Sequence, residues 1–72
     1  MDRIAALGDA RRIQVLGIAG VEPHAAATNE EALAAWGELS PDVAVLILTP
    51  ESAIALADRL VERPDLLVAV LP

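Results

Sequence analysis

The side chain that best fits a catalytic role in this sequence is Asp9, which follows the apolar residues 3–7 and a glycine. An aspartate there would lie at the carboxyl end of a parallel strand, where open α/β sheets bind their ligands. An acid that accepts a phosphoryl group, however, belongs at the end of the central strand and needs a lysine to stabilise the developing charge. The apolar run 43–48 ends instead in Thr49, and the sequence contains no lysine. We therefore expect Asp9 to be the N-terminal cap of a helix.

Other arrangements that carry chemistry are equally incomplete. His24 is the only histidine and cysteine is absent, and one side chain does not make a zinc site. A solvated histidine on an edge strand is the expectation for it. Thr49 and Ser52 have no plausible base for nucleophilic catalysis, and the glycines match neither a dinucleotide fingerprint nor a Walker loop. We expect no enzyme activity, no cofactor and no metal site.

Composition limits the partners that the chain can bind. The 72 residues suffice for one domain, and eleven acidic residues against five basic ones give a net charge of −6. Nucleic acids and anionic membrane surfaces need clustered cations, and only Arg11 and Arg12 are adjacent. The apolar run 43–48 is far short of the roughly 20 residues that span a bilayer, and residues 1–3 do not resemble a signal peptide. We expect a cytoplasmic protein with a protein partner.

Turn and cap residues divide the chain into alternating strands and helices. The expected strands are residues 3–7, 21–25, 43–48 and 66–71. A first helix follows Asp9 to about Ala19, with Gly20 as its stop. The second begins at the capping box of Thr28 and Glu31 and ends before Pro41. The third begins with Thr49 as cap and Pro50 at its first position, and it ends at Pro64.

This alternation predicts a single α/β domain, a small flavodoxin-like three-layer fold with a four-stranded parallel sheet and three helices. The uninterrupted apolar strand 43–48 belongs in the centre, because such runs are covered on both faces. Pro23 has no N–H to donate, so its strand belongs at an edge. The predicted strand order is therefore 2-1-3-4.

Each helix is also expected to bury one apolar face, following helical spacing. These faces comprise Ile13, Leu16 and Gly20 in the first helix, Leu33, Trp36 and Leu39 in the second, and Ile54, Ala57, Leu60 and Val61 in the third.

Several segments, taken in order, resemble a known family. Residues 4–9 (IAALGD) are similar to the opening strand and Gly-Asp turn of the F subunit of the V-type and archaeal rotary ATPases. Residues 18–21 (IAGV) resemble the end of its first helix, and residues 42–49 (DVAVLILT) resemble its Asp-Ile-Gly-Ile-Ile-Leu-Ile-Thr strand. Residues 66–72 (LLVAVLP) resemble the strand that ends in Ile-Pro. The sequence departs from the family at residues 15–17, where Gly-Phe-Arg is usual.

The resemblance implies a non-catalytic subunit that binds the coiled-coil shaft of the ATPase and couples ATP turnover to ion transport. The expected contact residues lie around the carboxyl ends of the strands, and they are Asp9, Arg12, Thr49 and Glu51. The alternative is a small ligand-binding or regulatory domain of flavodoxin-like architecture. The family continues past its final proline into a tail, so the apolar strand 66–71 is further expected to pair with a second copy as a homodimer.

Overall fold

The computed structural model describes residues 3–16 and 20–72, which form four strands, three α-helices and one short 3-10 turn. In chain order these are β1 (Arg3–Gly8), α1 (Ala10–Leu16), β2 (Val21–Ala25), α2 (Asn29–Glu38), β3 (Val43–Leu48), α3 (Pro50–Ala55), the 3-10 turn η1 (Leu60–Glu62) and β4 (Leu67–Val70).

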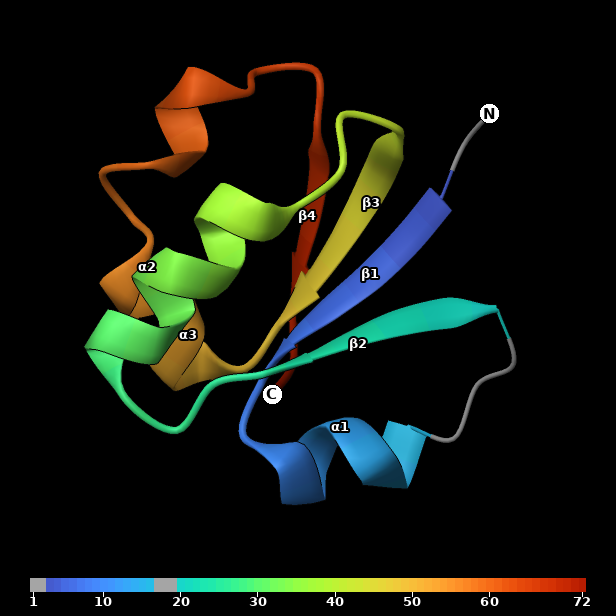
Figure 1. Cartoon of the computed structure of the whole chain (residues 1–72), viewed down its shortest axis with the longest axis vertical. Coiled ribbons are helices and arrows are strands. Elements are labelled where there is room, and N and C mark those ends of the chain that lie inside the picture. Colours follow the sequence, from blue (N-terminus) through green and yellow to red (C-terminus); the bar gives the residue numbers. More distant parts are fainter. Residues whose placement is uncertain (1–2, 17–19) are drawn as a thin grey trace.

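The four strands form one parallel sheet in the order β2-β1-β3-β4, as predicted (Figure 1). Leu7 in β1 pairs with His24 of β2 on one side and with Leu48 of β3 on the other. Leu48 in turn pairs with Val70 of β4. The apolar strand β3 is therefore central, and β2, which contains Pro23, lies at an edge. The α/β fold is confirmed.

The three predicted N-terminal caps are confirmed. A carboxylate oxygen of Asp9 accepts the N–H of Arg12 at 3.0 Å, and the Thr28 hydroxyl accepts the N–H of Glu31 at 3.1 Å. The Thr49 hydroxyl accepts the N–H of Ser52 at 3.3 Å. The Glu31 carboxylate reaches back to the N–H of Ala27 at 2.7 Å, one residue before the cap itself. Each cap satisfies a backbone donor that the helix leaves unpaired, so these residues fix where the helices begin.

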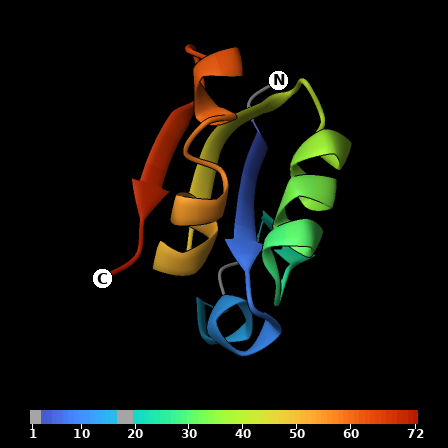
Figure 2. The ribbon, with the colours of Figure 1, turned by 90° about the vertical axis from the view of Figure 1, so that its left-hand side faces the viewer.

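The main core lies between the sheet and the helices α2 and α3, which stand together in front of the sheet in Figure 2. From the sheet it takes Ala5, Leu7, Leu46 and Leu48, and from the covering elements mainly Ala32, Ala35, Leu39, Leu56 and Leu66. Leu7, Leu46, Leu48 and Leu56 are fully buried. Alanines make up much of the contact layer that α2 presents to the sheet.

The predicted buried face of α2 is only partly correct. Leu39 is buried, but Leu33 is 39% exposed and Trp36 is half-buried. Ala32 and Ala35 take the inward positions instead. The Trp36 indole lies at the margin of the core, where its N–H donates to the Glu62 carboxylate at 3.2 Å, so its polar atom keeps a partner.

The predicted third helix is wrong in both length and face. α3 ends at Ala55 rather than near Pro64, and Ser52 and Leu56 point into the core. Ile54 lies two residues from each of them, which places it on the opposite side of the helix. It is accordingly 79% exposed. Ala57 and Val61, predicted to point inward, are also exposed, while Leu60 is half-buried. Beyond Leu56 the chain continues through turns and η1 to the start of β4.

The first helix begins after Asp9 as predicted. α1 ends at Leu16, and Ile13 is buried as expected. Its predicted continuation to Ala19 lies outside the described residues. Gly20 has a φ of 91°, a left-handed conformation that favours glycine.

Candidate functional site

Three of the four predicted contact residues lie at one corner of the molecule, at the carboxyl ends of β1 and β3. Asp9 caps α1, and Arg12 lies one turn further along the same helix. The Arg12 guanidinium donates to the carbonyl oxygen of Pro72 at 2.8 Å and lies 3.6 Å from a carboxylate oxygen of Glu51. Arg12 therefore joins the start of α1, the start of α3 and the residue after β4. Because the Glu51 side chain is 77% exposed and that of Arg12 is 37% exposed, their ion pair is expected to add little stability.

Thr49, the fourth predicted contact residue, plays a structural part. It is 1% exposed, and its hydroxyl is engaged in capping α3. Its side chain also lies directly against Gly8, where an added Cβ would stand 2.2 Å from the Thr49 Cγ2. Thr49 thus offers no side-chain surface to a partner. The Gly-Asp pattern of residues 8–9 indicated a turn, but position 8 requires glycine because the Thr49 side chain lies so close to it.

The surface with the clearest capacity for binding is the half of the sheet that no helix covers. α2 and α3 pack on the face of Leu46 and Leu48, so alternation places Val45 and Ile47 on the opposite face. α1 is the only described helix outside the α2/α3 layer, and its contacts are with β1 and β2. The remaining area over β3 and β4, with the adjoining part of β1, is here named the open sheet face. It consists of Ile4, Val45, Ile47, Leu67 and Ala69.

The open sheet face is apolar and accessible. Leu67 is 70% exposed and Ile4 is 40% exposed, while Val45 and Ile47 are half-buried. At its carboxyl end the face leads into an open groove of about 420 Å³, lined by Arg11, Arg12, Val15, Leu71 and Pro72. Val15 is 85% exposed. The groove therefore lies between α1 and the end of β4, and Leu71, two residues beyond Ala69, links it to the open sheet face.

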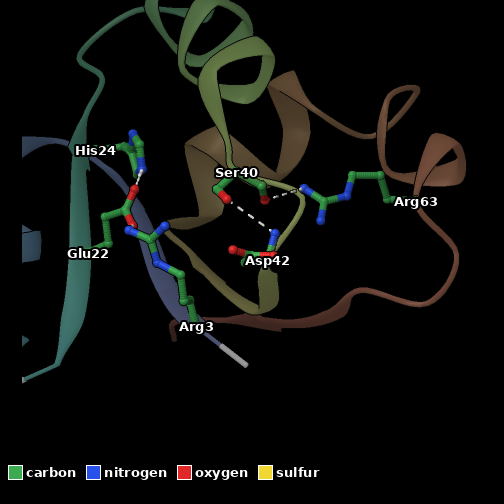
Figure 3. A network of polar contacts seen from close by, with 6 residues as sticks. All are labelled: Arg3, Glu22, His24, Ser40, Asp42 and Arg63. Atoms are coloured by element: carbon green, nitrogen blue, oxygen red, sulfur yellow. Dashed lines mark hydrogen bonds and ion pairs between the residues drawn. The ribbon is translucent and has the colours of Figure 1, made fainter. Parts of the chain in front are cut away.

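A separate polar network ties β1 to β2. Glu22 lies between Arg3 and His24 and pairs with both, the distance to the His24 Nε2 being 3.1 Å (Figure 3). The His24 side chain is 17% exposed, so the prediction of a solvated histidine is wrong. Glu22 and His24 share a face because they are two residues apart in a strand, a spacing that was visible in the sequence. The network has no feature of a catalytic site beyond this pairing.

Arg63 fixes the loop that leads into β3 (Figure 3). Its guanidinium donates to the carbonyl oxygens of Ser40 and Pro41, each at 3.4 Å, and of Val43 at 3.1 Å. The loop is also held by the N–H of Asp42, which donates to the Ser40 hydroxyl at 3.2 Å. Nothing in the sequence pattern indicated this role, since the partners are backbone atoms about twenty residues away.

Arg63→Met is expected to lower the free energy of unfolding by about 1–2 kcal/mol, because three carbonyl oxygens lose a charged donor. Arg59→Met is the matched control. Arg59 pairs only with exposed Glu62 one turn away, at 3.2 Å, and such pairs contribute little. Urea unfolding followed by circular dichroism measures both. Equal losses in the two variants would contradict a specific role for Arg63.

Within residues 3–16 and 20–72, no three His, Asp or Glu side chains converge in a way that could hold a metal ion. None of the helices in this part of the chain has the length and apolar character needed to cross a membrane.

Comparison of the chain with protein-family models, with curated proteins and with solved structures gave no match.

Proposed function

We propose that the chain is a non-catalytic subunit of the central stalk of a V-type or archaeal rotary ATPase. In this role it binds the coiled-coil shaft and turns with it, and it is cytoplasmic and peripheral to the membrane. The proposal rests on the sequence resemblance of residues 4–9, 18–21, 42–49 and 66–72 to the F subunit of these enzymes. Its action is protein contact without bond chemistry.

The observation that carries the binding role is the open sheet face. Parallel sheets are normally covered on both faces, and contiguous apolar surface on a small protein marks an interaction site. Here Leu67 is 70% exposed on β4, while Val68, on the opposite face of the same strand, packs against the main core. A partner that covers this face supplies the missing layer of the fold.

A rotor subunit must transmit torque without deforming, and the fold suits this requirement. β1 and β3 are each paired on both sides, and both run through the main core. A docking surface built on paired strands is held by the backbone ladder rather than by loops. Side chains on such a surface keep their spacing under load better than those on a mobile connection.

The direct test is complex formation with the coiled-coil shaft subunit of a V/A-type ATPase from the same organism. We expect a stable one-to-one complex in size-exclusion chromatography with light scattering, and a measurable affinity by calorimetry. A coiled coil of matched length from an unrelated protein is the control. No complex with the shaft, or equal binding to both coiled coils, would refute the proposal.

The groove next to the open sheet face favours a second candidate, a small-ligand or regulatory domain. Arg11 and Arg12 line it together with Val15 and Leu71, and guanidinium groups suit phosphate oxygens. Ligands of open α/β folds bind at this end of the sheet. Calorimetric titration with flavin mononucleotide and with ATP tests the candidate. Saturable binding that Arg11→Glu abolishes would favour it over the stalk role.

Self-association through β4 is a separate prediction. β4 is an edge strand in contact with β3 alone, and free edges pair readily with other chains. The N–H of Leu71 donates to the carbonyl oxygen of Leu48 in β3. Because N–H groups alternate in direction along a strand, the N–H of Ala69 also points toward β3, and the N–H of Val70 points away from the sheet. Light scattering at tens to hundreds of micromolar is expected to find a dimer that Val70→Pro weakens. A strictly monomeric chain at these concentrations would contradict it.

A further inference from the structure

We infer that the open sheet face seats one α-helix of the partner, lying beside α1 and antiparallel to the strands, with acidic residues in its first turn against Arg11 and Arg12. The inference rests on the proposed function in one respect, namely that the occupant belongs to another protein chain. It goes further by assigning the surface, the direction of the helix and the charges that it carries.

The width of the face admits a single helix. α1 occupies the part of this side over β1 and β2, which leaves mainly β3 and β4. Neighbouring strands lie about 4.8 Å apart, so two strands and their free edge offer roughly 10 Å, the diameter of one helix with its side chains. A second sheet or a bundle would overlap α1.

The length and chemistry of the face define the apolar side of the occupant. β3 has six residues, and at about 3.3 Å each the floor is roughly 20 Å long, which is enough for about 13 helical residues. Leu67, Ile4 and Ile47 form its floor without any charged side chain among them. A helix with an apolar stripe over three to four turns fills this surface, while a polar segment would bury unpaired groups.

Charge sets the direction of the helix. At the carboxyl ends of the strands lie Arg11 and Arg12, and Arg11 has no ion-pair partner among residues 3–16 and 20–72. At the amino ends, Asp42 and Asp65 precede β3 and β4, and both residues are exposed. A helix favours acids in its first turn and bases in its last. A helix that begins at the arginines and runs antiparallel to the strands places its acidic first turn against Arg11 and its basic last turn near Asp42 and Asp65. Arg63, the arginine beside Asp42, is engaged with backbone carbonyl oxygens.

The charge pattern also disfavours a second copy of this chain as the occupant. α2, the one helix with two acids in its first turn, has no base in its last turn and is packed on the main core. No other described helix carries acids at the start and bases at the end. A protein partner with that pattern is therefore the occupant that the face fits.

The test uses the whole chain and two stapled helical peptides of about 14 residues. Both carry the same apolar stripe; one has two glutamates in its first turn and two lysines in its last, and the other has these charges exchanged. We expect the first peptide to bind at least about ten-fold more tightly, and Arg11→Glu to remove that preference. Leu67→Glu is expected to weaken binding at least about ten-fold, while Ile54→Glu, equally exposed but on α3, leaves it unchanged.

The peptide experiment is independent of the shaft experiment, so the two proposals can fail separately. Equal affinity for both peptides, no effect of Leu67→Glu, or burial of Leu67 in a dimer of this chain would overturn the inference. If the shaft subunit binds wild type and Leu67→Glu alike, the stalk role stands and this surface assignment is wrong. Circular dichroism of each variant checks that the fold is retained.

Discussion

Gly8→Ala is expected to lower the free energy of unfolding by about 2–3 kcal/mol, the effect of forcing extra atoms into a packed interior. The new Cβ would stand 2.2 Å from Cγ2 and 2.7 Å from the hydroxyl oxygen of Thr49. Neither atom can move freely, because Thr49 is buried and caps α3. For a chain of 72 residues, whose whole stability is about 4–11 kcal/mol, this loss is a large fraction. Urea unfolding monitored by circular dichroism measures it.

Two further variants show whether the contact with Thr49 is the cause. Thr49→Ser removes the nearest atom and keeps the capping hydroxyl, so it should recover part of the loss when combined with Gly8→Ala. Gly37→Ala is the matched glycine control. No atom lies within 4 Å of its added Cβ, and Gly37 is helical, so we expect a gain of about 0.5–1 kcal/mol. A Gly8→Ala protein as stable as wild type would show that the two elements can separate without penalty.

Leu46→Ala is expected to destabilise the protein by about 3 kcal/mol. Leu46 is fully buried in the central strand, where it pairs with Ala5 on one side and Val68 on the other. Truncation of a buried leucine removes its transfer free energy and leaves a cavity, and the total is typically about 2–5 kcal/mol. For a domain of this size the thermal midpoint should fall by about 4–8 °C for each kcal/mol.

Leu67→Ala is the control for this substitution. The same atoms are removed from a strand residue that is 70% exposed, on the face without a helix. The isolated protein should therefore lose well under 1 kcal/mol of stability, as surface substitutions usually do. Comparable losses at Leu46 and Leu67 would mean that a second copy of the chain covers the open sheet face in the isolated protein, which would overturn its assignment to a partner helix.

The strand order and the helix starts were predictable because single residues determine them locally. Pro23 excludes its strand from the sheet interior, and the six apolar residues of β3 require cover on both faces. Asp9, Thr28 and Thr49 each accept a backbone N–H three residues ahead. These interactions depend on neighbours in sequence, so no tertiary contact overrides them.

The buried faces of the helices were less predictable because packing distance competes with hydrophobicity. The pattern favoured Leu33 and Ile54 as inward residues, but Ala32, Ala35 and Ser52 occupy the inward positions. Small side chains allow a helix to lie close to the sheet, and a single large residue, Leu56, then fills the core at the end of α3. Hydrophobic spacing alone contains no information on that distance.

The candidate site, too, was predictable only in part. Asp9, Arg12 and Glu51 meet as predicted because the carboxyl ends of parallel strands share one edge of the sheet. The open sheet face was not predicted, since it depends on which side of the sheet each crossover takes. α1 crosses between β1 and β2, while α2 and α3 lie together on the other side. On the side of α1, the part of the sheet over β3 and β4 is therefore left without a described helix.

The position of β1 in the sheet affects how the newly made chain folds on the ribosome. β1 is made before both of its neighbours in the sheet, and its pairing of Leu7 with Leu48 joins residues that are far apart in sequence. A nascent chain that stops short of Leu48 contains β1, α1 and β2 without the strand that covers the other side of β1. Such distant parallel pairing is slow to form, and the unpaired edge is open to aggregation until it does. Protease resistance should therefore appear abruptly, once β3 has been synthesised, rather than accumulate with chain length.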